Sequence, residues 1–411
     1  MRGANPSPSP KRQRRQALFA VSVLSTLLVA QELLLRFLFP IPPVHGFNRI
    51  HYQMLAGTSP TLRQSLRRGL AYVDLRFISR PDGFDHRHRL NLFGFRGSDF
   101  SIDRPADRRR VIVLGDSVAE GQGASESATI AAHLSRHWPD AEVLNLGVVA
   151  ADLPRLAHLA HDAIPLLRPT DVVLVLSAND LPAPFLDPSR LGPSRSFPRN
   201  TTPPAFPHAF GLVVRILSHQ PIYRRWPRPT LPFFPAVPAP TNPWTHVTSP
   251  PADIDPDLLH AMTAGQLNPW LAEQADAIPG MLAHDFSLGG SAAPYLQTIA
   301  AYCRQVQARL LVAYVPFCGV VHRRYADVQI QLGMAPTVAE ALPSDPIYRR
   351  QNHHLDEVCA RLRLPLVDTT EPLQAADQAG TLQYWPYDTH PTPQGYATIA
   401  QAIASAAARA D

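Results

Sequence analysis

Runs of hydrophobic residues alternate with segments of helical periodicity over most of the chain beyond residue 107. The apolar runs have the length and continuity of buried strands and lie at residues 110–114, 142–146, 171–176, 310–315 and 364–367. Hydrophobic residues at helical spacing predict helices over about residues 125–137, 154–167, 295–307, 344–362 and 393–403. Every position after Asp171 in the third run is apolar, as a strand buried on both faces requires. This alternation predicts an α/β fold with a parallel sheet and helices on both faces.

Two segments interrupt the alternation. Proline accounts for 44 of the 411 residues, many of them between Leu181 and Pro279. A structureless loop of that length is uncommon inside a compact domain. We therefore predict an ordered cap or substrate-binding insertion at about residues 183–290, with short helices at 210–217 and 255–271. Residues 40–106 lack clear periodicity and are predicted to form a membrane-proximal segment before a domain at 107–411.

The N-terminus has the composition of a membrane anchor. Residues 1–16 are basic and proline-rich, residues 17–30 are uncharged and mostly apolar, and the apolar character resumes up to Phe39. Residues 17–39 reach the length of about 20 residues that a spanning helix needs. A cleavable signal peptide is the alternative. In either case the basic head is predicted to stay cytoplasmic, with the rest of the chain facing outward.

Composition narrows the range of partners. The net charge is only +5, and arginine forms short clusters at residues 11–15 and 108–110, so no nucleic-acid surface is predicted. The three cysteines have no metal-binding spacing and are predicted to be buried thiols. Histidines gather at residues 85–88 and 353–354, but neighbouring arginines oppose a cation in the first group and adjacent helical positions diverge in the second. No metal is therefore expected.

Residues with catalytic potential occupy three places along the chain. Gly115-Asp116-Ser117 ends the first strand, Asn179 follows the third, and Asp388 and His390 precede the last helix. A serine hydroxyl becomes a nucleophile when a histidine that is oriented by a carboxylate removes its proton. The Asn179 amide and the backbone N–H of Ser117 are candidate donors to the oxyanion that forms next. Each segment alone has a plainer explanation, since Asp388-Thr389-His390 can cap a helix and Asn179-Asp180 can form a turn.

Taken in order, these segments resemble the sequence blocks of the SGNH (GDSL-type) hydrolases. The similar residues are Gly115-Asp116-Ser117, the block 145–150, Asn179-Asp180 and Asp388-Thr389-His390. Residues 91–97, which follow an N-terminal anchor, are similar to bacterial membrane-anchored members. The resemblance implies Ser117 as nucleophile, His390 as base, Asp388 as its partner and Asn179 as an oxyanion donor. It also implies a flavodoxin-like three-layer α/β/α sandwich with five parallel strands, no cofactor, and a single-pass inner-membrane protein whose catalytic domain faces the periplasm.

The sequence departs from the family pattern at two places. Ala150 occupies the position of the family's oxyanion glycine, and Gly147 lies three residues earlier. Alanine keeps the backbone N–H but tolerates a positive φ poorly. Asp388 lies two residues before His390, whereas the family's usual carboxylate lies three before. The shorter spacing is similar to some polysaccharide O-acetylating relatives.

Three functions are compatible with these residues. The first is an envelope esterase that removes acyl groups, with acetyl foremost, from a glycan or another small ester. The second is a polysaccharide O-acyltransferase that uses the same serine, histidine and aspartate, with a sugar hydroxyl replacing water. The third is a non-catalytic glycan-binding protein on this fold, in which aromatic residues of the insertion stack on sugar rings. The sequence makes no prediction of the oligomeric state.

Overall fold

The fold was examined in a computed structural model of the chain. It describes residues 10–38, 74–91, 93–149, 151–181, 254–264, 266–268 and 270–410. The helix predicted at 210–217 therefore lies outside the described residues, as does most of the proline-rich insertion.

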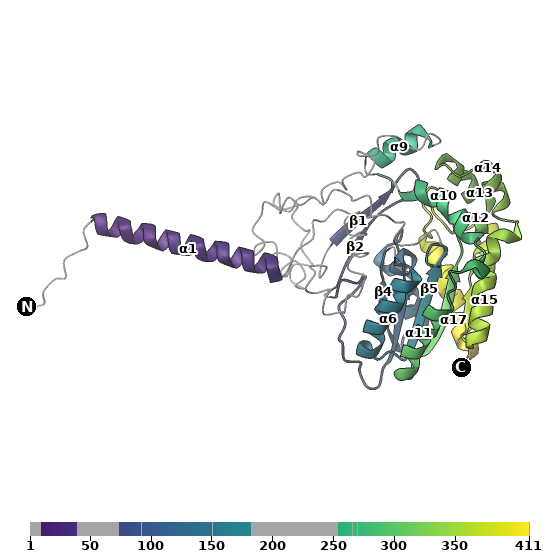
Figure 1. Cartoon of the computed structure of the whole chain (residues 1–411), viewed down its shortest axis with the longest axis horizontal. Helices are drawn as coiled ribbons and strands as arrows, with labels where there is room; N and C mark the ends of the chain where they lie inside the picture. Colours follow the sequence, from purple (N-terminus) through teal and green to yellow (C-terminus); the bar gives the residue numbers. More distant parts are fainter. Residues whose placement is uncertain are drawn as a thin grey trace, which may run out of the picture.

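A five-stranded parallel sheet forms the centre of the fold (Figure 1). Its strands are β3 (Arg109–Gly115), β4 (Ala141–Gly147), β5 (Asp171–Ser177), β6 (Arg309–Val315) and β7 (Leu366–Asp368). They lie in the order β4-β3-β5-β6-β7, so the strand order reverses at β3. In open α/β sheets, ligands bind beyond the carboxyl ends of the strands at such a reversal. The five predicted strands are confirmed, although β7 begins two residues later than its apolar run.

Helices cover both faces of the sheet. They are α4 (Ser117–Glu120), α5 (Ile130–His137), α6 (Leu153–Leu167), α11 (Ala293–Gln305), α12 (Cys318–Val321), α13 (Arg323–Gln331), α14 (Pro336–Ala341), α15 (Arg350–Leu362), α16 (Thr370–Gln378) and α17 (Pro393–Ala410). Short 3-10 helices, η1 (Glu126–Ala128) and η5 (Pro346–Arg349), precede α5 and α15. The five helices that the alternation with the strands predicted are present, and α4, α12, α13, α14 and α16 are additions that the periodicity did not indicate.

Side chains of β3 alternate between two hydrophobic cores. Val111 and Val113 pack in the core that α5 and α17 cover. Ile112 and Leu114 pack in the core beneath α6, α11 and α15. Because successive residues of a strand point to opposite faces, a strand between two helical layers is apolar at nearly every position. The structure is thus the predicted three-layer α/β/α sandwich. The cysteines at 303, 318 and 359 are free and buried in these cores, as predicted.

The segment 74–106 has regular structure that the hydrophobic pattern did not predict. Strand β1 (Asp74–Ser79) pairs with β2 (Phe84–Arg89) in an antiparallel hairpin. Phe77 and Phe84 pack with Val149, and the buried Arg96 donates hydrogen bonds to carbonyl oxygens of the segment that follows α4. The alternation of apolar and polar residues in β2 is not evident from the sequence, because a fully buried position of this strand is occupied by a histidine, His88, instead of an apolar residue. This part of the expected membrane-proximal segment therefore packs on the α/β core.

The end of the predicted insertion also joins the core. Helix α9 (Pro256–Thr263) and helix α10 (Trp270–Leu282) occupy the region where one helix over 255–271 was expected. Apolar residues of both helices belong to the hydrophobic core that also contains Val315 and Phe317, at the carboxyl end of β6. Helix α10 thus lies close to the edge of the sheet where ligands bind, and two of its residues line the cavity there.

The N-terminal helix α1 extends from Pro10 to Leu38. Within it, residues Arg14–Leu34 are long and apolar enough to cross a membrane, with a mean hydropathy of 1.9. A signal sequence near the N-terminus has the same properties. The helix already includes residues 10–16, which were predicted to form part of a separate basic head.

Candidate active site

Ser117 lies at the junction of β3 and α4. Strand β3 ends at Gly115, Asp116 caps α4, and Ser117 is the first residue of the helix. The Oδ1 atom of Asp116 accepts the N–H of Val118 at 2.8 Å, which satisfies one of the free donors at the helix start. A side chain at Gly115 would lie 2.6 Å from the carbonyl oxygen of Val175, so only glycine permits this close approach of β3 and β5. The turn places the Ser117 hydroxyl at the predicted edge of the sheet.

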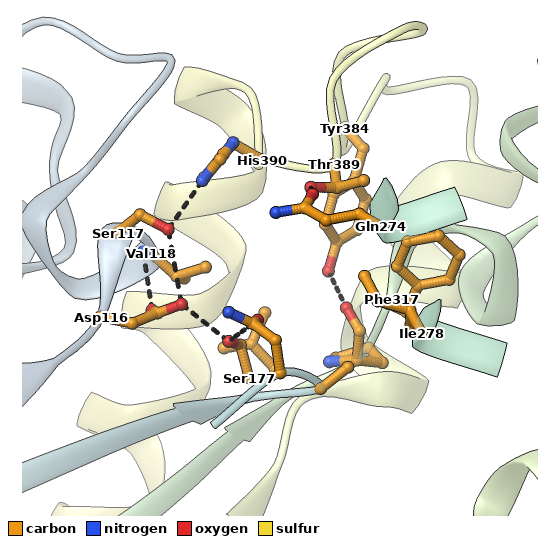
Figure 2. A pocket seen from close by; sticks show the side chains of 14 residues that line it. Asp116, Ser117, Val118, Ser177, Gln274, Ile278, Phe317, Tyr384, Thr389 and His390 are labelled. Atoms are coloured by element: carbon orange, nitrogen blue, oxygen red, sulfur yellow. Dashed lines mark hydrogen bonds between the residues drawn. The ribbon is translucent and has the colours of Figure 1, made fainter. Parts of the chain in front are cut away.

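Ser117, His390 and Asp388 form one chain of hydrogen bonds. Figure 2 shows its first contact, between Ser117 and His390. The Nε2 atom of His390 lies 2.8 Å from the Oγ atom of Ser117. The Nδ1 atom of His390 is hydrogen-bonded to Oδ1 of Asp388, which also accepts the backbone N–H of His390 at 3.1 Å. Since a carboxylate only accepts, this contact keeps a proton on Nδ1 and leaves Nε2 as the base. The structure brings together the three residues that the sequence predicted for the nucleophile, base and orienting carboxylate.

All three residues are shielded from water. Ser117 is 8% exposed, His390 6% and Asp388 1%. Burial by itself would lower the pKa of His390, but the charge of Asp388 and its hydrogen bond favour the protonated ring. The result is a pKa of His390 above its ordinary value. Surroundings of this kind stabilise the imidazolium that forms when a histidine takes the proton of a serine.

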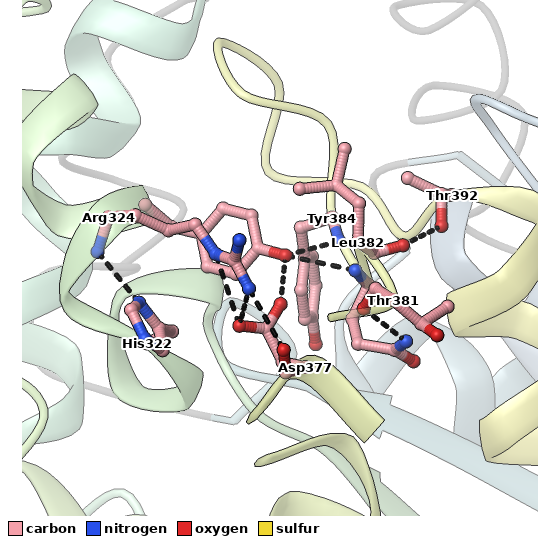
Figure 3. Close-up of polar contacts among 9 residues, drawn as sticks. His322, Arg324, Asp377, Thr381, Leu382, Tyr384 and Thr392 are labelled. Atoms are coloured by element: carbon pink, nitrogen blue, oxygen red, sulfur yellow. Dashed lines mark hydrogen bonds and ion pairs between the residues drawn. The ribbon is translucent and has the colours of Figure 1, made fainter. Parts of the chain in front are cut away.

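A polar cluster behind the site holds the loop that carries Asp388 and His390 (Figure 3). The hydroxyl of Tyr325 donates to the buried carboxylate of Asp377 and accepts the backbone N–H groups of Gln383 and Tyr384. Arg324 is ion-paired with the same carboxylate. Tyr384 in turn donates to the carbonyl of Pro316 at the end of β6. No local pattern in the sequence links residues 325 and 377 to a loop at 383–392, so this cluster was not predicted.

The proposed oxyanion donors lie in different surroundings. Asn179 lines the cavity in front of Ser117, and its Oδ1 atom lies 2.8 Å from the hydroxyl of Ser177. Ala150 lies outside the described residues. The N–H of Gly147, by contrast, donates to Oδ1 of Asn145 at 2.9 Å, so it is not directed at a substrate.

Gly147 has a packing role instead of the expected donor role. A Cβ atom there would lie 2.2 Å from the backbone nitrogen of Glu120 and 2.6 Å from its Cα. The absence of a side chain allows β4 to touch α4, the helix that begins with Ser117. The expectation that Gly147 contributes an oxyanion donor is therefore wrong for this structure.

A narrow cavity of about 30 Å³ opens in front of Ser117. Its walls come from the β3–α4 turn, the ends of β5 and β6, the loop of His390, and helix α10. Two α10 residues one turn apart, Gln274 and Ile278, contribute to the wall, and Oε1 of Gln274 accepts a hydrogen bond from Thr389 at 3.1 Å (Figure 2). The composition of the sequence predicted a covering insertion, but no pattern in it indicated that these two residues face Ser117.

The histidine groups considered for metal binding have other contacts. The Nδ1 atom of the buried His88 lies 2.8 Å from Oε1 of Glu120. The Nε2 atom of His354 accepts the backbone N–H of Ala292. Within the part of the chain that the structure describes, no three histidine, cysteine, aspartate or glutamate residues form a group suited to a metal ion.

Several solved structures are similar to this chain. A lipolytic protein of the G-D-S-L family from Veillonella parvula is 10% identical, and the match covers 72% of this chain and 97% of that one with a TM-score of 0.34. A GDSL-like lipase from Bacteroides thetaiotaomicron is 12% identical, with 74% and 89% covered and a TM-score of 0.33. An acetyl xylan esterase is 10% identical, with 72% and 98% covered and a TM-score of 0.34. No protein-family model and no curated protein matches the sequence.

Proposed function

We propose that the chain is a serine ester hydrolase of the SGNH type that removes a small acyl group, with acetyl foremost, from a carbohydrate or another small ester. The observation that carries the proposal is the chain of hydrogen bonds from Ser117 through His390 to Asp388 at the carboxyl edge of the sheet. The stability of the fold does not require a nearly buried serine that is hydrogen-bonded to a histidine beside a cavity. It supplies what acyl transfer to serine needs: a nucleophile, a base within reach, and a carboxylate that orients the base.

The reaction would proceed in two steps. Nε2 of His390 takes the proton of Ser117 while Oγ attacks the ester carbonyl carbon, and the carbonyl oxygen becomes an oxyanion. The side-chain amide of Asn179 and the backbone N–H of Ser117 are the proposed donors to that oxyanion. The alcohol then leaves with the proton from His390, and an acyl-serine remains. Water, activated by the same histidine, attacks the acyl-serine and releases the acid and the free hydroxyl of Ser117.

The size of the cavity supports a small acyl group. A volume of about 30 Å³ exceeds the 10–15 Å³ or so that one water occupies on the same measure, but it is far below the roughly 150 Å³ cavity that binds benzene in another protein. Ile278 and Phe317 are both buried and lie in the wall. A methyl group fits such a space.

The N-terminal helix supports a location at a membrane. Residues Arg14–Leu34 would cross the bilayer, and the arginines at its start would remain on the cytoplasmic side by the positive-inside rule. The hydrolase domain would then face the periplasm of a bacterial cell, where acylated glycans of the envelope are accessible. A cleaved signal sequence would send the domain to the same side.

The proposal is tested by labelling the full chain in detergent micelles with a fluorophosphonate probe, and by following hydrolysis of an aryl acetate. Ser117→Ala should lose both labelling and turnover. Ser98→Ala, which changes an exposed serine, should retain both and serves as the matched control. Labelling with fast turnover identifies the esterase, whereas a labelled protein with a long-lived acyl-serine that reacts only with a sugar hydroxyl identifies the acyltransferase. A folded wild-type protein that neither labels nor turns over would reject the proposal and favour a glycan-binding role.

A further inference from the structure

The hydroxyl of Ser177 lies between two oxygen atoms of the site. Its Oγ atom is 2.9 Å from Oδ2 of Asp116 and 2.8 Å from Oδ1 of Asn179. A serine hydroxyl has one proton and can donate it to only one of these neighbours. The other neighbour must therefore donate to Ser177, and two arrangements of protons satisfy this condition.

In the first arrangement Asp116 is ionised. It then accepts the proton of Ser177, and Asn179 must turn its NH₂ group towards Ser177 in order to donate. This rotation of the amide would place Oδ1, an acceptor, on the side of the cavity. An acceptor there would repel the oxyanion instead of stabilising it.

In the second arrangement Asp116 is neutral. Its Oδ2–H donates to Ser177, the hydroxyl of Ser177 donates to Oδ1 of Asn179, and the NH₂ group of Asn179 is left for the cavity. Oδ1 of Asp116 meanwhile accepts the N–H of Val118 at 2.8 Å, so both carboxyl oxygens have partners of the correct kind. Only this arrangement leaves Asn179 able to donate to an oxyanion.

We propose that Asp116 works as a neutral carboxylic acid, and that it orients the amide of Asn179 through the hydroxyl of Ser177. The inference rests on the proposed function, because it assumes that Asn179 donates to an oxyanion. Asp116 and Ser177 are positioning residues in this view: they act on the substrate only through Asn179. Figure 2 shows the Ser117, Asp116 and Ser177 side chains in succession below His390.

The surroundings of Asp116 favour its neutral form. Its side chain is 1% exposed, and burial raises the pKa of the carboxyl more than the hydrogen bonds from Val118 and Ser177 lower it. A second buried carboxyl lies on the other side of the same serine, since Oδ2 of Asp180 accepts the backbone N–H of Ser177 at 2.8 Å. Burial also raises the pKa of Asp180, and the neighbouring Asp116 adds to that rise.

A neutral Asp116 also protects the nucleophile. The Oγ atom of Ser117 lies 3.4 Å from Oδ2 of Asp116 and 2.8 Å from Nε2 of His390. An ionised Asp116 would compete with His390 for the proton of Ser117. With its own proton directed at Ser177, Asp116 leaves the hydroxyl of Ser117 to the histidine.

The test compares three variants in the full chain. Asp116→Ala and Ser177→Ala should lower kcat for an aryl acetate by about 10–100-fold with little change in KM. This loss is smaller than the 10²–10³-fold or so that complete removal of one oxyanion donor costs, because Asn179 is still present. Asp116→Asn should restore at least about tenfold of the loss in Asp116→Ala, because its Oδ1 accepts from Val118 and its NH₂ donates to Ser177 as the neutral acid does. A folded Asp116→Asn protein as inactive as Asp116→Ala would overturn the inference.

An infrared measurement keeps the test independent of activity and of the stability of the alanine variant. The wild-type protein should show a carbonyl band of a protonated carboxyl that disappears in Asp116→Asn, and a difference spectrum without that band would overturn the inference. Fluorophosphonate labelling of the wild type distinguishes the two proposals. If the wild type is labelled but shows no such band, only the neutral state of Asp116 is rejected. If the wild type is not labelled, the hydrolase proposal is rejected, and the positioning role of Asp116 is rejected with it.

Discussion

The Nε2 atom of His390 lies 2.8 Å from Oγ of Ser117, although 273 positions of the chain separate the two residues. Ser117 is held by the turn after β3, and His390 by a loop that is anchored on β6 through Tyr384 and Pro316. Both elements lie at the same edge of the central sheet because its five strands are parallel. The contact gives the serine proton a direct route to the base.

Replacement of Asp388 should separate the role of the carboxylate from that of the fold. In Asp388→Asn the amide can donate to Nδ1 of His390, which moves the ring proton to Nε2 and removes the base that faces Ser117. We expect kcat for an aryl acetate to fall by about 10³–10⁴-fold, as in other serine hydrolases, while circular dichroism shows a folded protein. A loss of less than about tenfold would mean that another group orients His390.

The pH profile should follow His390. The base must be unprotonated to act, and its pKa lies above the ordinary value of 6.5. Activity is therefore present above that raised pKa and lost as the pH falls through it. We expect the acid limb of kcat/KM, which reports on the free enzyme, to lie above pH 6.5. In the residual activity of Asp388→Asn the limb should move to lower pH, because the carboxylate charge no longer favours the protonated ring. A wild-type limb at or below pH 6.5 would contradict the assignment.

Gly147→Ala should disturb the nucleophile without touching it. The added Cβ would lie 2.2 Å from the backbone nitrogen of Glu120, so α4 must shift and take Ser117 with it. We expect a loss of about 1–3 kcal/mol in the free energy of unfolding, the usual cost of overpacking, together with reduced kcat. The matched control is Gly280→Ala, an exposed helical position with nothing within 4 Å of the new Cβ, which should be neutral or stabilising. Equal stability of the two variants would refute the packing role.

Tyr325→Phe should loosen the loop that carries His390. The substitution removes the hydroxyl that accepts from the backbone N–H groups of Gln383 and Tyr384 and donates to Asp377. Buried groups left without partners cost about 1–3 kcal/mol each, so we expect a clearly lower Tm and a reduced kcat. Tyr295→Phe, at a half-buried position on α11 in the other core, is the control and should change neither. An unchanged Tm and kcat in Tyr325→Phe would show that the cluster does not hold the loop.

Helix α10 should set the length of the acyl group. Ile278→Ala enlarges the cavity in front of Ser117, so kcat/KM for butyryl relative to acetyl aryl esters should rise by at least about fivefold, which corresponds to about 1 kcal/mol of pocket contacts. Leu282→Ala removes a buried side chain from the same helix outside the cavity wall and controls for loss of stability. If both variants change the ratio equally, the wall at Ile278 does not select the acyl group.

Local chemistry explains why much of the core and the three residues of the Ser117–His390–Asp388 hydrogen-bond chain were predictable. A strand covered on both faces must be apolar along its length, so β3 and β5 are visible as continuous runs wherever they pack. Serine after a strand, and aspartate and histidine before a helix, likewise belong to short segments whose residue types suggest their chemistry. The order of these segments, together with their resemblance to a known family, was enough to name Ser117, Asp388 and His390.

The tertiary structure alone decided the features that depend on distant neighbours. From the sequence, Gly147 was a plausible oxyanion donor. In the structure its N–H donates to Asn145 and its Cα lies against α4. Strand β2 was hidden because its buried inward residue is His88, whose partner Glu120 is 32 positions away. Gln274 is a candidate wall residue because α10 lies against the loop of Thr389. Ser177 is a candidate positioning residue because the end of β5 lies beside the turn of Asp116. Hydrogen bonds and close contacts act over a few ångströms in space, and nothing in the spacing of a sequence records which residues the fold will bring that close.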